Sequence, residues 1–525
     1  MCIRDRYNTS LSRIFMKKVF KNYINKIENS RVYEVANVSP LSKADYLSKE
    51  MGNTIYLKRE DLQPTHSFKI RGAYNKIAHL CKSKKISEVA TASAGNHAQG
   101  VAYSAKELGI KATIFMPKTT PLIKVNAVKE LKAKVVLVGN NFDDALKESR
   151  VFCKKNKVNF IHPFDDPLVI AGQGTVGMEI SEQFPENLYA VFVAVGGGGL
   201  IAGIGAYLKK SHPNVKIIGV EAADSAGLQA SILAGKRIKL KEVGLFADGA
   251  AAKQIGKHNY ELIKDFLDDS ITVDTDEICA AVKDTFMETR TVPEPTGALA
   301  LAGLKKYVGQ KRIKNKNLIA TYCGSNLNFE SLGHIVERSK IGEKKEIILS
   351  ISIDEKKGAF RKLCKDIGQR NITEFSYRKD ASASAKILLG LELQDSKKSK
   401  ELFLKNLKIR KYLFTDLSND EISKKHLKFM HGGRGPELDN ELVEEVFSVD
   451  FPEKPGALLN FLSLLKDNWD ISLFHYKNQG AIYGGALVGF TLKENEVKNL
   501  ERDLLKIAYP FTRETENLGY QAFLK

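Results

Sequence analysis

The chain has 525 residues and a formal net charge of +19 at pH 7, from 81 basic and 62 acidic residues. This length is too great for one domain and predicts about two to four. A hydrophobic content of 43% and a charged content of 27% are typical of globular proteins and exclude a disordered chain. No uninterrupted apolar run reaches the ~20 residues of a membrane-spanning helix, so we expect no membrane partner.

The positive charge does not indicate a nucleic-acid partner. Proteins that bind nucleic acids concentrate basic residues on one element and interleave aromatic residues, whereas the lysines here lie mostly in helical stretches that also carry glutamate. The six cysteines are scattered without close pairs, which predicts reduced thiols, a cytoplasmic location and no zinc site. These cysteines are Cys2, Cys81, Cys153, Cys279, Cys323 and Cys364.

The N-terminal residues differ from the rest of the chain. The first fifteen residues, which begin Met-Cys-Ile-Arg-Asp-Arg, resemble read-through sequence, so Met16 is a candidate for the native start. A basic N-terminus is also compatible with a transit peptide. We assign residues 1–24 to a tail and place no function there.

From about Val35 to Phe329, apolar strand-like runs alternate with helical stretches. This alternation predicts an α/β unit built on mainly parallel sheet. The stretch from Ala98 to Leu108 is expected to be a helix that ends at Gly109. The predicted strands are Ile55 to Arg59, Glu88 to Ala92, Lys111 to Met116, Lys134 to Val138, Ala190 to Val195, Lys216 to Val220 and Asn317 to Thr321.

Lys69 lies where a predicted loop becomes a helix, directly after Ser67 and Phe68. A serine at such a boundary can accept hydrogen bonds from first-turn amides. A lysine at a helix N-terminus is disfavoured in its charged form by the helix dipole. A neutral amine can form an imine with an aldehyde. The alternative is a solvated lysine on an amphipathic helix, and this motif alone favours that alternative.

A second strand-to-helix junction carries the small residues Ser93, Ala94 and Gly95, followed by Asn96 and His97. Small residues let the backbone approach a ligand, and Asn96 offers amide donors and acceptors. We interpret the junction as an anion site suited to a carboxylate. His97 is a candidate general base, although a histidine in a first helical turn is more often structural.

Four consecutive glycines, Gly196, Gly197, Gly198 and Gly199, precede Leu200 between a predicted strand and a helix. Backbone amides at such a junction converge on an anion, and the helix dipole adds to the attraction. We interpret this segment as a phosphate-binding loop, with a tight packing turn as the alternative. The spacing also fits a loose dinucleotide fingerprint, with Glu221 about 20 residues on. Its mid-chain position argues against an NAD-binding protein, which would also leave Lys69 unexplained.

Tyr322 and Cys323 follow the last predicted strand of the α/β unit, ahead of Gly324, Ser325 and Asn326. A small polar side chain at this position could contact the nitrogen of a heterocycle. The alternative for Cys323 is a buried apolar filler, which is the commoner role of cysteine.

After Gly342 a module appears twice. Strands are predicted at Glu346 to Ile353, Asn371 to Tyr377, Ala385 to Leu393 and near Arg410, and then at Glu444 to Asp450, Asp470 to Tyr476 and Ala486 to Leu492. A Lys-x-Gly-Ala or Lys-Pro-Gly-Ala turn opens a helix after the first strand of each copy, at Gly358 and Gly456. The recurrence indicates an internal repeat. The polar stretch from Asn419 to Gly435 is a plausible linker.

Together these motifs resemble the pyridoxal-phosphate enzymes of fold type II, the tryptophan synthase β-type. Within them the chain resembles the biosynthetic threonine dehydratases from about Asn25 to Lys525. The motifs that carry the resemblance are Ser67 to Ala73, Ser93 to Gly100, Gly196 to Leu200, Val220 to Ala226, Glu294 to Ala298 and Cys323 to Asn326. The resemblance implies a catalytic domain of two parallel-sheet subdomains at 25–340, ACT-like α+β (ferredoxin-like) modules at 345–415 and 441–525, and a linker at 416–440.

The resemblance also implies residue roles. Lys69 would hold pyridoxal 5'-phosphate as an imine, with Phe68 against its ring, Asn96 on the ring hydroxyl and Cys323 at the ring nitrogen. Gly196, Gly197, Gly198, Gly199 and Leu200 would hold the phosphate, and Ser93, Ala94, Gly95 and Asn96 the substrate carboxylate. Many relatives have serine in place of Cys323, but cysteine occurs in serine-dehydratase-like relatives. The acidic metal site of serine racemases is not reproduced, because Ser225 and Gly227 stand near Glu221, and we expect no metal.

The reaction that the resemblance implies converts L-threonine into 2-oxobutanoate and ammonia, the first step of isoleucine biosynthesis, with Lys69 as the base for the α-proton. L-Serine would be a poorer substrate. The C-terminal modules would bind isoleucine as feedback inhibitor and valine as its opponent, in a homotetramer. Rival hypotheses are another enzyme of the same fold, an amino-acid sensor with an inactive catalytic half, and an NAD-binding protein.

Overall fold

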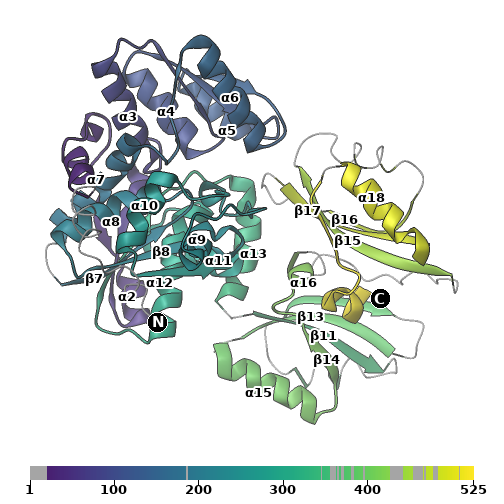
Figure 1. Ribbon diagram of the computed structural model, residues 1–525. Coiled ribbons are helices and arrows are strands. Elements are labelled where there is room, and N and C mark those ends of the chain that lie inside the picture. The colour runs from purple at the N-terminus through teal and green to yellow at the C-terminus, as the bar shows by residue number, and fades with distance from the viewer. Residues whose placement is uncertain are drawn as a thin grey trace. The chain divides into compact units, whose positions relative to one another are not determined.

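The computed structural model describes residues 20–184, 187–343, 346–354, 362–363, 366–367, 372–379, 384–393, 396–425, 441–452, 461, 465, 469–476, 483–507 and 509–524. The chain divides into two compact units, one ending at Asn328 and one beginning at Phe329 (Figure 1). The first fifteen residues, the loops around Gly358 and Gly456 and most of the expected linker lie outside the described residues.

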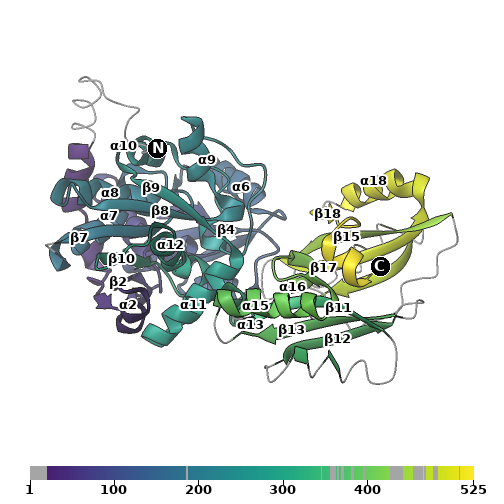
Figure 2. The same ribbon diagram turned by 90° about the horizontal axis from the view of Figure 1, so that it is seen from below.

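The larger sheet of the first unit contains six described strands in the order β1-β2-β10-β7-β8-β9. Strand β1 is antiparallel to β2, and the other neighbours are parallel, as expected for an α/β unit. Figure 2 shows β7, β8 and β9 lying side by side. The strands are β1 (Leu41–Lys43), β2 (Thr54–Arg59), β7 (Leu188–Ala194), β8 (Lys216–Ala222), β9 (Asp269–Val273) and β10 (Asn317–Tyr322).

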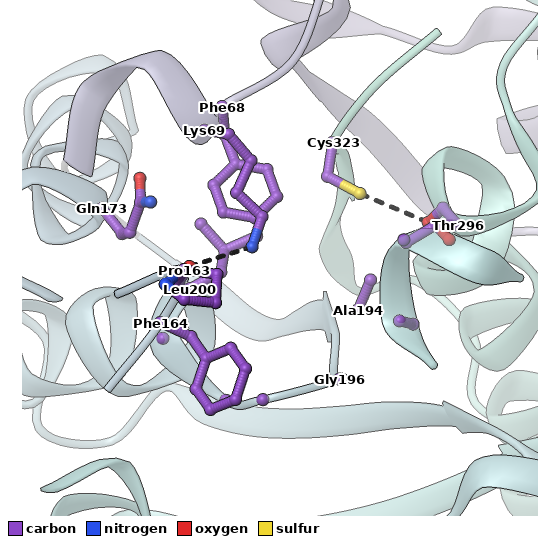
Figure 3. Close-up of a pocket in the computed structure, with 15 residues that line it drawn as sticks. Phe68, Lys69, Pro163, Phe164, Gln173, Ala194, Gly196, Leu200, Thr296 and Cys323 are labelled. Atoms are coloured by element: carbon purple, nitrogen blue, oxygen red, sulfur yellow. Dashed lines mark hydrogen bonds between the residues drawn. The ribbon is translucent and has the colours of Figure 1, made fainter. Parts of the chain in front are cut away.

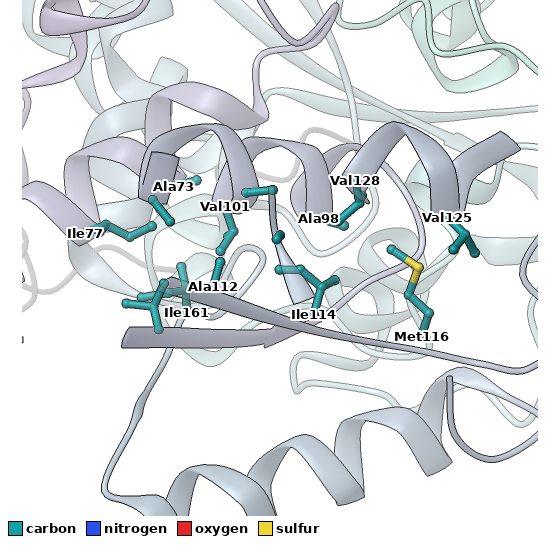
Figure 4. Close-up of a cluster of buried hydrophobic side chains, with 14 residues drawn as sticks. Ala73, Ile77, Ala98, Val101, Ala112, Ile114, Met116, Val125, Val128 and Ile161 are labelled. Atoms are coloured by element: carbon teal, nitrogen blue, oxygen red, sulfur yellow. The ribbon is translucent and has the colours of Figure 1, made fainter. Parts of the chain in front are cut away.

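A smaller, fully parallel sheet has the order β5-β4-β3-β6 among the described strands. Its strands are β3 (Glu88–Ala92), β4 (Lys111–Met116), β5 (Lys134–Leu137) and β6 (Asn159–Phe160). Alternate residues of β4 face opposite sides. Ile114 packs with Ala98 and Val101 of one helix layer (Figure 4), whereas Phe115 packs with Ala145 on the other side. The sheet is therefore covered on both faces.

Helices cover both faces of the larger sheet as well. An added Cβ at Gly303 of α12 would contact the side chain of Val220, whereas one at Gly219 would contact Ile201 of α8. Because Gly219 and Val220 are successive strand residues, α8 and α12 lie on opposite faces. The helices of this unit are α2 (Asp45–Met51), α3 (Lys69–Ser83), α4 (Asn96–Glu107), α5 (Leu122–Glu130), α6 (Phe142–Asn156), α7 (Pro167–Gln183), α8 (Gly199–Ser211), α9 (Gly227–Ala234), α10 (Lys257–Phe266), α11 (Thr275–Thr289) and α12 (Pro295–Lys311).

A buried ionic cluster fixes the start of α3. The guanidinium of Arg71 donates to both carboxylate oxygens of Glu60 and of Glu179, over 2.5 to 3.1 Å. The ammonium of Lys58 donates to the same Glu179 over 2.7 Å. The side chains in these ion pairs are fully buried, and their charges balance. Since Arg71 lies two residues after Lys69, the cluster anchors the turn that carries the predicted cofactor lysine.

The second unit contains two antiparallel sheets with matching strand orders, β12-β13-β11-β14 and β16-β17-β15-β18. In each, the first strand of the module lies between the third and the fourth, so the predicted repeat is confirmed. The elements are α13 (Leu332–Gly342), β11 (Glu346–Asp354), β12 (Ile372–Lys379), β13 (Ser384–Glu392), α15 (Ser396–Ile409), β14 (Leu413–Asp416), α16 (Glu421–Lys425), β15 (Leu442–Pro452), β16 (Asp470–Tyr476), β17 (Tyr483–Lys493), α18 (Val497–Ile507) and β18 (Phe511–Arg513).

The two modules share an apolar cluster. Ile348 of β11 and Leu388 of β13 pack with Val446 of β15 and Leu487 of β17, and Tyr520 joins them. The neighbouring residue Leu349 belongs instead to the first module's own core. Strand β11 is therefore buried on both faces, because one face covers its module and the other contacts the second module.

The predicted fold class is confirmed: an α/β unit with two parallel-sheet subdomains is followed by two α+β modules. The predicted strands Glu88 to Ala92, Lys111 to Met116 and Asp470 to Tyr476 have the predicted bounds. None of the described helices is both long and apolar enough to cross a bilayer.

Candidate active site

The loop before α3 brings Lys69 next to Cys323. The backbone N–H of Phe68 donates to the carbonyl of Cys323 over 3.2 Å, and Ser67 forms an antiparallel bridge with Gly324. The expectation that Ser67 caps the helix is wrong: α3 begins without a side-chain cap, and the hydroxyl of Ser67 has no partner among the described residues. Because Ser67 is held in the bridge, Phe68 occupies the N-cap position instead.

The amine of Lys69 is held inside a cavity. Its Nζ donates to the carbonyl of Pro163 over 3.1 Å and lies 5.2 Å from the ring centroid of Phe68 (Figure 3). Burial lowers the pKa of Lys69 to about 8, although Cys323 and Glu294 act in the opposite direction. The sequence also predicted a lowered pKa for Lys69, but it attributed the shift to the helix dipole, whereas desolvation by burial is the main cause. At pH 7 roughly a tenth of this amine is then uncharged, far more than for a lysine with the usual pKa of about 10.4.

The cavity has an empty volume of about 400 Å³, part of it open to solvent. It joins Lys69, Phe68 and Cys323 to the glycine loop, which come from segments far apart in the sequence (Figure 3). The predicted residues in its lining are Phe68, Lys69, Gly196, Gly197, Gly198, Gly199, Leu200 and Cys323. Ser93, Ala94, Gly95 and Asn96 are not part of this lining.

The glycine loop opens α8, and the N-terminus of this helix lines the cavity, where backbone amides favour an anion. Gly198 has φ 90°, a left-handed conformation that other residues rarely adopt. An added Cβ at Gly197 would lie 2.2 Å from the ring of Phe164, and one at Gly196 would lie 2.7 Å from the backbone of Ala250. Packing therefore accounts for part of the glycine run, alongside any anion that the amides bind.

Asn96 lies beside the cavity in a chain of side-chain hydrogen bonds. Its Oδ1 accepts from Asn326 over 2.7 Å, and its Nδ2 donates to Glu294 over 2.6 Å. One hydrogen of Nδ2 remains for another acceptor. Burial and the nearby Asp248 raise the pKa of Glu294 to about 7. Glu294 and Asn326 were not predicted as site residues, although both lie in motifs that carry the family resemblance.

The junction before α4 is open. An added Cβ at Gly95 would meet nothing within 4 Å, whereas the hydroxyl of Ser93 accepts from the N–H of Gly95 over 3.3 Å. His97 is buried, and its Nε2 donates to the carbonyl of Ile161 over 3.0 Å. Burial, with a smaller contribution from Lys69, lowers the pKa of His97 to about 3. A neutral ring held in this way favours the structural role for His97.

Cys323 and Thr296 form the wall opposite the lysine. The thiol of Cys323 donates to the backbone carbonyl of Thr296 over 3.2 Å (Figure 3). Burial raises the pKa of this thiol, so it stays protonated. Thr296 was not predicted as a site residue; its motif, Glu294 to Ala298, was the only signal.

Glu221, whose position fits the dinucleotide alternative, is used within the protein itself. Its two carboxylate oxygens accept from the backbone N–H groups of Leu228 and Gln229 at the start of α9, over 2.7 and 2.8 Å. Both oxygens are thus used by the protein itself. No group of three or more histidine, cysteine, aspartate or glutamate side chains that could hold a metal ion occurs within the described part of the chain.

The lining fits pyridoxal phosphate. A partly neutral amine is available for the aldehyde, backbone amides at a helix N-terminus for the phosphate, and a ring lies beside the amine. The hydroxyl of Thr296 is buried in this wall without a partner among the described residues, so the wall has an unused hydrogen-bonding group. Fold and site together define a pyridoxal-phosphate enzyme of fold type II.

Comparisons with known proteins narrow this class. A family model described as pyridoxal-phosphate dependent enzyme matches residues 33–324. A model described as the C-terminal regulatory domain of threonine dehydratase matches twice, at residues 337–427 and 437–524. The biosynthetic L-threonine dehydratase of Burkholderia multivorans is 45% identical over 506 residues, which cover 96% of this chain and 99% of the relative. That of Escherichia coli is 45% identical over 502 residues, covering 96% and 97%.

Solved structures of related enzymes also resemble this chain. The processed form of threonine deaminase isoform 2 from Solanum lycopersicum matches with a TM-score of 0.60 and 43% identity over 61% of this chain and 88% of that one. Maize serine racemase matches with a TM-score of 0.56 and 29% identity over 60% of this chain and 96% of that one. The chain belongs to the biosynthetic threonine dehydratase family. It is a pyridoxal-phosphate-dependent lyase with a regulatory C-terminal part, and the NAD-binding alternative is set aside.

Proposed function

We propose that the protein converts L-threonine into 2-oxobutanoate and ammonia, the first step of isoleucine biosynthesis, and that isoleucine inhibits it through the C-terminal modules. The observation that carries the catalytic part is the cavity in which the amine of Lys69 faces the glycine loop that opens α8. The repeated regulatory match at 337–427 and 437–524 supports the second part.

The lining supports the residue roles that we propose. Lys69 would hold the cofactor's aldehyde carbon, with Phe68 beside the ring and Cys323 near the ring nitrogen. The amides of Gly196, Gly197, Gly198, Gly199 and Leu200 would hold the phosphate. Asn96, which lies outside the lining, would donate its remaining Nδ2 hydrogen to the ring hydroxyl, because its other polar atoms are used by Glu294 and Asn326.

The substrate carboxylate binds at the junction before α4, formed by Ser93, Ala94, Gly95 and Asn96. The open space at Gly95 supports this placement, because a ligand can approach the backbone there. The junction lies outside the cavity lining, but the hydrogen bond from Asn96 reaches Glu294, two residues before the lining residue Thr296.

The chemistry divides between the cofactor and the chain. When bound, pyridoxal phosphate supplies an electron sink for the pair left at the substrate's α-carbon. Lys69, as a free amine, takes the α-proton, and its lowered pKa of about 8 suits a base near neutral pH. The carbonyl of Pro163 orients the Nζ of Lys69 for this transfer. The β-hydroxyl leaves as water, which takes up one proton in balance with the α-proton that Lys69 accepted. The released enamine tautomerises to an imine, and a water molecule hydrolyses the imine to the oxo acid and ammonia.

L-Serine lacks only the methyl group and is a poorer substrate, since a methyl contact favours threonine by only ~1–3 kcal/mol. Valine opposes isoleucine, and each effector acts by binding one of two global states more tightly. We further propose a homotetramer in the cytoplasm, where free thiols such as Cys81 and Cys153 stay reduced. The proposed domains are the N-terminal tail at 1–24, the catalytic domain at 25–340, modules at 345–415 and 441–525, and a linker at 416–440.

The test is oxo-acid release from purified, cofactor-saturated enzyme with threonine, serine and phosphohomoserine. Threonine is expected to react fastest, and Lys69→Ala is expected to lower turnover by roughly 10²–10⁴-fold or more. Full turnover in Lys69→Ala, or no oxo acid from threonine, contradicts the catalytic proposal. Isoleucine should inhibit and valine should relieve the inhibition; an unchanged rate with isoleucine contradicts the regulatory part alone.

A further inference from the structure

The glycine loop before α8 is held from behind by Asn259 of α10. Asn259 is fully buried, and its Nδ2 donates to the backbone carbonyl of Gly197 over 2.6 Å and to that of Phe164 over 3.1 Å. The backbone N–H of Gly256 donates to the same carbonyl of Gly197 over 3.1 Å. Gly197 and Phe164 line the cavity, whereas Asn259 and Gly256 do not. The carbonyl of Gly197 is therefore held by groups that lie outside the cavity.

The direction of this carbonyl fixes the direction of a neighbouring amide. In a trans peptide the carbonyl of one residue and the N–H of the next point in opposite directions. Because the carbonyl of Gly197 points toward Asn259, the N–H of Gly198 points away from Asn259. Gly198 is the N-cap residue of α8, where N–H groups have no partner within the helix and favour an anion. A reversed peptide would present a carbonyl oxygen instead, which repels a phosphate.

The contacts of Asn259 assign its amide orientation. Both carbonyl oxygens lie at Nδ2, so an exchange of Nδ2 and Oδ1 would bring three oxygens together without a hydrogen between them. The turn that carries Asn259 is itself fixed, because the carboxylate of Asp165 accepts from the backbone N–H groups of Lys257 and His258 over 2.8 Å each. Asn259 is thus a firmly placed donor to the glycine loop.

We propose that Asn259 is a positioning residue for the cofactor phosphate: by holding the carbonyl of Gly197, it keeps the N–H of Gly198 directed at the phosphate of bound pyridoxal phosphate. The inference rests on the proposed phosphate loop and deepens it, because it names a side chain outside the cavity on which that loop depends. Consecutive glycines put little steric restraint on the direction of their own peptides. The amide of Asn259 supplies the restraint that the glycines lack.

Asn53 offers a matched control. Asn53 is 6% exposed, and its Nδ2 also donates to two backbone carbonyls, those of Met51 and Ile313, over 3.0 and 2.9 Å. Asn53 and its two acceptors lie outside the cavity lining and the glycine loop. Replacing either asparagine by leucine removes both donations and keeps a side chain with the same branching, but only Asn259→Leu releases a peptide of the loop.

The experiment titrates full-length apoenzyme with pyridoxal phosphate and with pyridoxal, which lacks the phosphate, and follows the absorbance of the imine. The wild type is expected to bind pyridoxal phosphate more tightly. Asn259→Leu should weaken binding of pyridoxal phosphate by roughly 10- to 100-fold, because a hydrogen bond to a charged group is lost, and should change the affinity for pyridoxal by no more than about twofold. A merely structural role would weaken both. Asn53→Leu should keep the wild-type ratio of the two affinities.

Asn259→Ala carries the same expectation and decides the matter if Asn259→Leu does not fold. A wild-type ratio of the two affinities in either folded variant of Asn259 overturns the inference. Equal binding of pyridoxal phosphate and pyridoxal by the wild type contradicts the proposed phosphate loop, and the inference with it. These titrations need no turnover, so failure of the threonine assay contradicts the proposed reaction alone.

Discussion

The side-chain amide of Asn96 donates to Oε1 of Glu294 over 2.6 Å, and this bond joins the N-terminus of α4 to the N-terminus of α12. Asn96 belongs to the smaller parallel-sheet subdomain and Glu294 to the larger one. The bond therefore crosses between the subdomains beside the cavity that holds Lys69. Since Glu294 is buried, its protonation couples this contact to pH.

Glu294 should make stability fall as pH rises. Burial and Asp248 raise its pKa from 4.5 to about 7, so the folded chain keeps a proton that the unfolded chain releases first. The unfolded state is then favoured progressively between about pH 4.5 and 7, by an amount on the order of 3 kcal/mol at most. Glu294→Gln should remove this dependence. Denaturant unfolding of wild type and variant at pH 5 and pH 8 measures it, and parallel pH profiles would contradict it.

The glycine loop should tolerate substitution differently at adjacent positions. Gly197→Ala places a Cβ 2.2 Å from the ring of Phe164 and should destabilise the protein by about 1–3 kcal/mol. Adding Phe164→Ala should recover part of this loss. Gly198→Ala should not be rescued, because its φ of 90° is strained whatever lies nearby. Thermal melting of the single and double variants measures the difference.

Gly309→Ala is the control for these glycines. It lies inside α12, and an added Cβ would meet nothing within 4 Å. Alanine there should raise stability by up to about 1 kcal/mol through helix propensity. An added Cβ at Gly198 would lie 3.0 Å from the side chain of Ile255. Rescue of Gly198→Ala by Ile255→Ala would therefore show that crowding, and not backbone conformation, requires that glycine.

The buried ionic cluster should be far more sensitive than a surface ion pair. Glu179→Gln leaves Arg71 and Lys58 with excess buried positive charge and should cost about 3–5 kcal/mol. Glu28→Gln removes a pair with Lys210 in which the side chains are 39% and 48% exposed, and should cost only about 0–1 kcal/mol. Chemical denaturation of both variants provides the comparison. Equal costs would mean that the cluster does not anchor α3.

In the second unit, the cluster shared by the two modules should govern stability. Leu487→Ala truncates a fully buried side chain of β17 that belongs to one cluster with Ile348 of β11 and Val446 of β15, and should cost about 2–5 kcal/mol. Leu505→Ala, on the exposed face of α18 where the side chain is 68% exposed, should change stability by no more than about 0.5 kcal/mol. If Leu487→Ala also leaves inhibition by isoleucine intact, contact between the modules does not transmit the effector signal.

Much of the fold could be predicted because its signals are local. The apolar runs of β3 and β4 and the alternation with helices are visible within a few residues, and so is the doubled C-terminal module. Lys69 and the run from Gly196 to Gly199 stood out for the same reason, since each combines an unusual residue with a strand-to-helix junction.

The rest of the site depends on contacts between distant residues. The carbonyl of Pro163 reaches Lys69 across 94 positions, and Asn96 reaches Glu294 across 198. Phe164 explains Gly197 only once the ring is seen against the glycine. The expected cap by Ser67 failed because the bridge to Gly324 overrode local propensity.

The sequence by itself determined the class of chemistry, since a lysine amine, a glycine loop and a repeated module are local patterns that can be recognised from the order of the residues alone. Only the tertiary structure decided which groups stay unpaired beside Lys69. Thr321 and Thr296 have the same side chain and both are buried, but only Thr296 lines the cavity. Whether a hydroxyl finds a partner depends on what the folded chain places within about 3 Å of it, and no spacing along the chain specifies that.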